Sequence, residues 1–321
     1  MLLRNHARYT LALAFVALFS ACKKDEEAAA TPAAVAKATS TPQAAIDSAV
    51  SHLKTGNIKA LVMSQVPPSH LEEMRANWQK ELAEDPPTEQ EKQEFKTMMA
   101  ELMAPDAEAK LMAKLEPQLV KFETEYAPQL PMMIGMGQGL LQQGVKDNKE
   151  LTEPQKIEAA KSIDALAKWI QTVKVSDREL ARRAVSEVVA AARELDLKTL
   201  DQARALDFDT AMDKSGIAFR AAKDVLAAYG LSLDQALETV KTQVVSEQGD
   251  TAKVRVSYVM FAQPMTFDTE LVKVDGRWYG KQTIDELNKP DEPEVDDEAP
   301  GDESFDDESE AADESPEPVE G

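Results

Sequence analysis

Residues 251–282 read TAKVRVSYVMFAQPMTFDTELVKVDGRWYGKQ, and this stretch decides the fold class. Apolar and polar residues alternate along 251–262 and again along 266–274, which is the pattern of half-buried β-strands. Pro264 is expected to interrupt the pattern between these two runs. The Asp-Gly pair at 275–276 is typical of a tight hairpin turn, which leads into a last strand expected at 277–282. With a further strand expected within 236–247, these residues predict an antiparallel meander of three to four strands.

The residues before the sheet carry a helical pattern. From about 41 to 230, apolar residues recur every three to four positions, and prolines and turn residues divide the run into separate helices. Residues 153–173 and 177–195 have the clearest helical spacing. One face of an antiparallel sheet must be covered, so we expect these helices to pack on it. The chain is therefore predicted to be α+β and mostly α, with a helical body followed by the C-terminal meander.

A weak internal similarity divides this folded part. Residues 52–61 resemble residues 191–200, and both read as helix, tight turn and helix; real duplication and chance are both left open. The second copy and the meander after it resemble an NTF2-like domain of exported bacterial proteins over roughly 177–285. That resemblance implies a sheet that curls around helices to form a cone. We therefore expect a helical domain at 43–176 and a helix-plus-sheet domain at 177–288.

The first 22 residues have the composition of an export signal. Arg4 and Arg8 precede a run, residues 9–22, that carries no charge. This run is shorter than the roughly 20 apolar residues that a membrane-spanning helix needs. Residues 18–22, Leu-Phe-Ser-Ala-Cys, resemble the lipobox of bacterial lipoproteins, although Phe19 stands where leucine is usual.

The lipoprotein resemblance implies that residues 1–21 are a signal peptide and that Cys22 becomes the lipid-carrying N-terminus. Cys22 is the only cysteine, so no intramolecular disulfide can form, and lipidation gives this residue a role. Residues 22–42 would then be a lipidated tether, rich in Ala, Thr and Pro, that joins the chain to the lipid bilayer. The residue after the cysteine is Lys23, not the aspartate that retains such proteins in the inner membrane. The periplasmic face of the outer membrane is therefore expected, with simple secretion as the alternative.

Most of the negative charge lies at the C-terminal end. Residues 290–321 hold 16 acidic residues and no Lys or Arg, so the rest of the chain carries only −6 of the net −22. Such a segment buries too little apolar surface to offset the entropy of ordering. We therefore predict a disordered acidic tail at 289–321, with binding of a cation or a basic partner as the alternative. Nucleic-acid binding is disfavoured, because an acidic chain repels phosphate and no basic stripe is present.

The sequence does not predict a catalytic residue, a cofactor or a metal site. Only His52 and His70 follow the signal, neither has the spacing of a zinc site, and no P-loop or nucleophile elbow occurs. Asp207, Asp209 and Asp213 cluster, but the glycine that a calcium-binding loop requires is missing. We interpret these three carboxylates as the solvated start of a helix.

Methionines are the most distinctive local feature. Met132, Met133 and Met136 lie close together after Pro131, with further methionines upstream. Flexible thioethers can fill a helical core, form an adaptable apolar binding surface, or bind Cu(I). All three interpretations are left open, and the second makes these residues a candidate apolar surface.

Two functions follow as expectations. The first is a non-enzymatic envelope lipoprotein that acts through an envelope protein partner, with an unknown oligomeric state. The second is binding of a small apolar ligand in an NTF2-like cavity. The aromatic residues that would line this cavity are Tyr258, Phe267, Trp278 and Tyr279. An enzyme in the same cavity is disfavoured, because the charged residues of the strands fit an outer face.

Overall fold

A computed structural model describes residues 39–149 and 151–289. The expected signal peptide, Cys22, most of the expected tether and the acidic tail from 290 onward lie outside the described residues. Contacts group the chain up to Asn288 as one compact unit, and a second unit begins at Lys289. The expected division between residues 176 and 177 falls inside the first unit.

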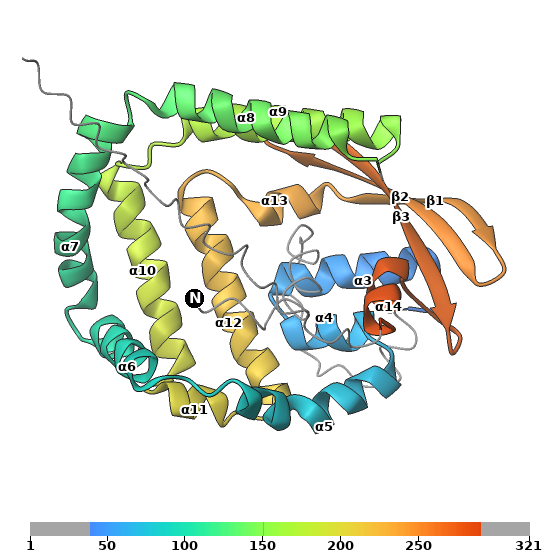
Figure 1. Cartoon of the computed structure of the whole chain (residues 1–321), viewed down its shortest axis with the longest axis horizontal. Helices are drawn as coiled ribbons and strands as arrows, with labels where there is room; N and C mark the ends of the chain where they lie inside the picture. Colours follow the sequence, from blue (N-terminus) through green and yellow to red (C-terminus); the bar gives the residue numbers. More distant parts are fainter. Residues whose placement is uncertain (1–38, 150, 290–321) are drawn as a thin grey trace, which may run out of the picture. The chain divides into compact units, whose positions relative to one another are not determined.

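The fold is α+β and mostly helical, as predicted (Figure 1). Its helices precede a four-stranded antiparallel sheet, and one short helix follows it. The helices before the sheet are α3 (Pro42–Thr55), α4 (Ile58–Gln65), α5 (Pro68–Glu84), α6 (Glu89–Met103), α7 (Ala107–Lys121), α8 (Leu130–Asp147), α9 (Glu153–Thr172), α10 (Arg178–Leu195), α11 (Leu200–Arg204), α12 (Phe208–Ala228) and α13 (Leu233–Glu238). A π-helical turn, η2 (Phe122–Tyr126), joins the end of α7 to the residues before α8.

Side-chain caps explain where several helices begin. The Thr41 hydroxyl accepts a hydrogen bond from the Ala44 N–H, and Pro42 occupies the first turn of α3. Thr88 and Glu91 form a capping box at the start of α6. Asp207 caps α12 through the Thr210 N–H, which agrees with the predicted helix start. These caps satisfy N–H groups that have no partner within the helix.

The turn between α3 and α4 packs directly on α12. Gly56 ends α3 with a φ of +70°, a conformation that glycine adopts without a steric penalty. A Cβ on Gly216 of α12 would lie 2.6 Å from the Gly56 carbonyl oxygen, so only glycine fits there. Beside this contact, the buried ammonium of Lys223 donates to the Lys54 carbonyl at 2.8 Å and to Asp234 at 2.6 Å. Lys223 therefore caps the C-terminal end of α3 with a positive charge.

The sheet is a meander of β1 (Lys241–Gln248), β2 (Thr251–Met260), β3 (Gln263–Val274) and β4 (Arg277–Gly280). Its inner face packs against α3, where Ala45 contacts a buried cluster of sheet residues that includes Trp278. Helices α9 and α13 pack against the sheet in a second buried cluster, which is formed by Ala165, Ala236, Met260 and Met265.

The strand limits differ from the predicted ones in three places. The expected first strand, 236–247, begins too early, because α13 continues to Glu238. Pro264 does not interrupt the third strand, because β4 pairs only with residues 271–274 and leaves Pro264 on a free edge of β3. The chain also turns helical at once after β4, in α14 (Lys281–Leu287).

Candidate functional site: an exposed apolar face on helix α8

Helix α8 carries its apolar side chains at the surface. Its residues, LPMMIGMGQGLLQQGVKD, have charges only in the last turn, at Lys146 and Asp147. None of them is buried. A helix of a globular protein normally buries its apolar stripe, so this exposure marks a candidate binding surface.

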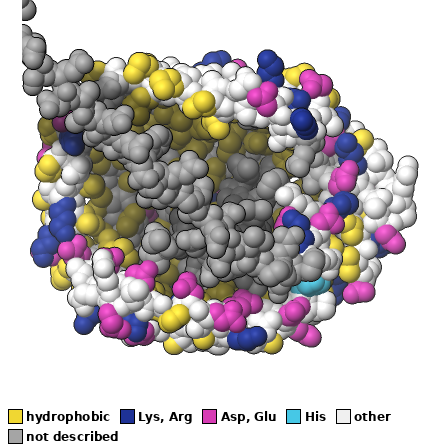
Figure 2. Space-filling model, viewed as in Figure 1, with side chains coloured by type: hydrophobic (Ala, Val, Ile, Leu, Met, Phe, Trp, Pro, Cys, Tyr) yellow, Lys and Arg dark blue, Asp and Glu magenta, His cyan; other side chains and the backbone are white. Residues whose placement is uncertain are grey.

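Five large apolar residues of α8 are each more than half exposed. They are Met132 (62%), Met133 (52%), Met136 (62%), Leu140 (73%) and Leu141 (55%), and we call them the α8 apolar face. Met132, Met136 and Leu140 recur every four residues, so they stack along one side of the helix. Met133 and Leu141 widen this strip. Figure 2 shows hydrophobic side chains gathered over the part of the molecule that Figure 1 labels α8.

Polar bonds hold the opposite side of α8 to α9. The Gln138 and Gln142 amides both donate to one carboxylate oxygen of Asp164, at 2.7 and 2.6 Å. Because Asp164 accepts both bonds, it fixes the rotation of α8 and turns the apolar face away from α9. The two helices run side by side, joined by a short connection (Figure 1).

Helix α9 in turn is fixed to the sheet. Its Ala165 lies in the buried cluster with Met260 and Met265, and its Trp169 ring lies 5.5 Å from the Phe261 ring. The Ser162 hydroxyl lies 3.5 Å from the Met265 sulfur. The α8 apolar face is therefore attached to the sheet through α9, although α8 itself has no buried side chain.

The structure separates the methionines that the sequence grouped together. Met132, Met133 and Met136 are exposed on α8, so they do not form a helical core. Upstream, Met99 is 4% exposed, and Met112 packs against the buried cluster of Val185 and Val189. Sequence reasoning missed Leu140 and Leu141. Their signal was helical spacing, because Leu140 lies four residues after Met136 and Leu141 lies eight residues after Met133.

The other singled-out carboxylates and histidines are engaged in local structure. Asp207 caps α12, Asp209 accepts two hydrogen bonds from Arg75, and Asp213 pairs with Lys59 at 3.1 Å. The His52 ring bonds to the Ser48 hydroxyl, and burial lowers the pKa of His52. Within the described ranges, no group of three or more His, Cys, Asp or Glu residues is placed to hold a metal ion.

The four aromatic residues of the expected cavity lie in packed surroundings. Trp278 and Tyr279 are each 1% exposed, and Trp278 belongs to the cluster beneath α3. The Tyr258 and Phe267 rings meet edge to face at 6.3 Å. None of the four lines the recess between α3 and β1 or the groove between α6 and α7.

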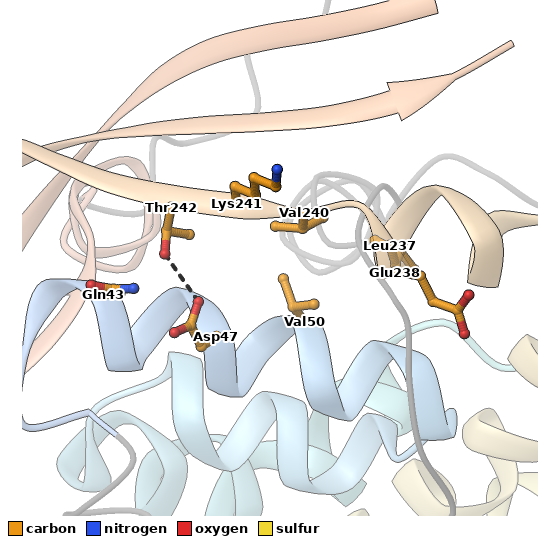
Figure 3. Close-up of a pocket in the computed structure, with 8 residues that line it drawn as sticks. All are labelled: Gln43, Asp47, Val50, Leu237, Glu238, Val240, Lys241 and Thr242. Atoms are coloured by element: carbon orange, nitrogen blue, oxygen red, sulfur yellow. Dashed lines mark hydrogen bonds between the residues drawn. The ribbon is translucent and has the colours of Figure 1, made fainter. Parts of the chain in front are cut away.

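A polar recess of about 480 Å³ lies between α3 and the start of β1 (Figure 3). Asp47 lies on its α3 side and accepts a hydrogen bond from the Thr242 hydroxyl at 3.2 Å. Burial raises the pKa of Asp47, against the smaller opposite effect of this bond. The residues lining the recess include no His or Cys, and its titratable side chains are Asp47, Glu238 and Lys241.

No described helix is both long and apolar enough to cross a bilayer. Comparison with known proteins found no matching family model, no matching curated protein and no matching solved structure.

Proposed function

We propose that this chain is a lipid-anchored protein of the bacterial cell envelope that binds apolar segments of other envelope proteins on the α8 apolar face. Acylated Cys22 would hold it at the periplasmic face of the outer membrane. The single observation that carries the binding role is the exposure of the five apolar residues of α8. In this proposal the protein has no enzymatic activity of its own.

The chemistry of the face favours a protein segment. Three of its five side chains are methionines, whose unbranched, polarisable thioethers adapt to apolar partners of different shape. The face itself carries no charge and no hydrogen-bond donor, so its partner must also be uncharged and apolar where the two touch.

The charges around the face argue against insertion into an anionic bilayer. Helices that lie in a membrane surface carry Lys and Arg along their polar side. Helix α8 has one lysine, Lys146, followed directly by Asp147. The chain as a whole carries a net charge of −22, which repels anionic lipid. We therefore assign the face to a protein partner and the contact with lipid to Cys22.

A binding experiment tests this proposal. The probe is a fluorescent synthetic peptide of leucine and glutamine that forms an uncharged amphipathic helix. The protein is the chain from residue 22 onward with Cys22→Ser, so that no acyl chain competes for the face. We expect saturable binding, weakened about tenfold or more by the triple change Met132→Ser, Met136→Ser and Leu140→Ser.

A matched control replaces three exposed apolar residues elsewhere on the surface with serine. Met98, Val120 and Val188 are each between 41% and 48% exposed on other helices, and their change to serine should leave peptide binding unaltered. Equal losses in the two triple variants would contradict the proposal. So would binding to vesicles of anionic phospholipid in place of the peptide.

A further inference from the structure

The described methionines range from buried to more than half exposed, and the two ends of this range differ in access to solvent. Met132, Met133 and Met136 lie within five consecutive residues of α8 and are each more than half exposed. Met99 and Met265 are 4% and 3% exposed, and each is part of the packed interior. An oxidant dissolved in water therefore reaches the exposed methionines directly and the buried ones only when the fold opens.

Oxidation of a thioether changes the property on which the α8 apolar face depends. A sulfur lone pair attacks one oxygen of hydrogen peroxide, the S–O bond forms as the O–O bond breaks, and the released hydroxide takes up the remaining proton as water. Sulfur is oxidised to the sulfoxide, and the peroxide is reduced. The product is a polar group with a strong hydrogen-bond acceptor in place of an apolar one.

We propose that Met132, Met133 and Met136 form a methionine oxidation site, with hydrogen peroxide as the oxidant, and that their sulfoxides switch off apolar binding at the α8 face. The inference rests on the proposed function of that face. Three of its five apolar side chains become polar together, and a bound apolar partner would have to bury these sulfoxide oxygens without hydrogen bonds.

Because of where these methionines lie, their oxidation would change binding at the α8 apolar face without unfolding the protein. Helix α8 has no buried residue, and it is held by the bonds from Gln138 and Gln142 to Asp164 on its other side. A sulfoxide on the exposed side remains hydrated and displaces no packed neighbour. Oxidation of Met265, by contrast, would place a polar oxygen in the cluster that joins α9 to the sheet. Among the described methionines, those that are more than half exposed all lie on α8, where oxidation carries no such structural cost.

Peptide mapping after peroxide treatment tests the site itself. Trypsin releases residues 122–146 as one peptide that contains these three methionines and no others. Residues 97–110 form a second peptide, in which exposed Met98 adjoins buried Met99. We expect the three α8 methionines to oxidise on the order of tenfold faster than Met99 and Met265 in the folded chain. Equal rates would overturn the proposal.

The consequence for binding is measured on the same samples. The oxidised chain should keep its melting temperature and lose affinity for the leucine-glutamine peptide about tenfold. The two methionine sulfoxide reductases, one for each sulfoxide epimer, should together restore both the thioethers and the affinity. An oxidised chain that retains its affinity would overturn the switch.

Two variants separate this inference from the proposed function. The triple change Met132→Leu, Met133→Leu and Met136→Leu keeps the face apolar and removes its thioethers, so it should bind the peptide before and after peroxide. The control Met98→Leu should stay sensitive to peroxide. If the untreated chain does not bind the peptide, the proposed function fails, while the oxidation rates still decide whether the site exists. If the triple-leucine variant loses binding on oxidation, the switch lies elsewhere and this inference fails.

Discussion

At the scale of single residues, two helical glycines carry opposite constraints that the sequence does not distinguish. A Cβ on Gly216 would lie 2.6 Å from the Gly56 carbonyl oxygen, whereas a Cβ on Gly135 meets nothing within 4 Å. The position of Gly56 at the end of a helix could be predicted locally. The role of Gly216 could not, because its partner lies 160 residues away in the chain.

These environments predict opposite effects of the same substitution. Gly216→Ala should destabilise the protein by about 1–3 kcal/mol, because the backbone contact with Gly56 must open. Gly135→Ala should stabilise it by about 0.5–1 kcal/mol, because alanine loses less entropy in a helix and has free space there. Urea denaturation of the two variants measures both changes. A stabilising effect at Gly216 would show that α12 does not pack on the turn between α3 and α4.

At the scale of elements, alternation of apolar and polar residues located the strands but not all of their ends. Residues 251–274 were correctly assigned to two strands, because each has one buried and one exposed face. The helix α13 was missed since its six residues are too few to show a helical period against the strand that follows. Exposure of the α8 face could not be predicted either, because an apolar stripe looks the same whether or not another element covers it.

The attachment of α8 to α9 depends on Asp164, and this dependence can be tested. Asp164→Ala removes the acceptor of both the Gln138 and the Gln142 bonds. Hydrogen bonds to a charged group contribute about 1.5–3 kcal/mol, so amide exchange in α8 should accelerate at least about tenfold. Exchange in α10 and the sheet should be unchanged. Hydrogen exchange read by mass spectrometry measures this.

A carboxylate on α8 itself, Asp147, provides the control. Asp147 accepts a bond from Gln143 within α8 and makes no link to α9, so Asp147→Ala should leave exchange in the body of α8 nearly unchanged. Equal acceleration in the two variants would mean that α8 is held by its apolar contacts with α9 and not by Asp164.

At the scale of the whole molecule, the fold class predicted from the sequence is confirmed, and the expected division between residues 176 and 177 lies inside the unit that contacts define up to Asn288. The packing of α10 against α6 and α7 joins the segments before and after residue 176. Contacts between residues so distant in sequence leave no local pattern, whereas helix and strand periods do. The proposed anchor likewise rests on local sequence, because Cys22 lies outside the described residues.

Lipid anchoring and apolar binding are separate proposals. Substitutions at two neighbouring residues, Cys22 and Lys23, test the anchoring proposal by itself. Sixteen residues lie between Cys22 and the first described residue, Thr39, so the distance between these two residues is at most about 60 Å when the chain is extended. An anchored chain would therefore meet its partners close to the membrane. Cys22→Ser should prevent acylation and release the protein from the membrane fraction, because two or more acyl chains are what makes such anchoring stable.

Lys23→Asp is the matched change one residue further along. It keeps the cysteine, so the protein should stay in the membrane fraction and carry the same acyl mass, but the lipoprotein resemblance predicts a shift from the outer to the inner membrane. Cell fractionation and the intact mass of the mature protein measure both results. If the Cys22→Ser protein stays with the membrane, lipid is not its anchor. Further loss of membrane association when Met132, Met136 and Leu140 are also changed to serine would then place the contact at the α8 apolar face.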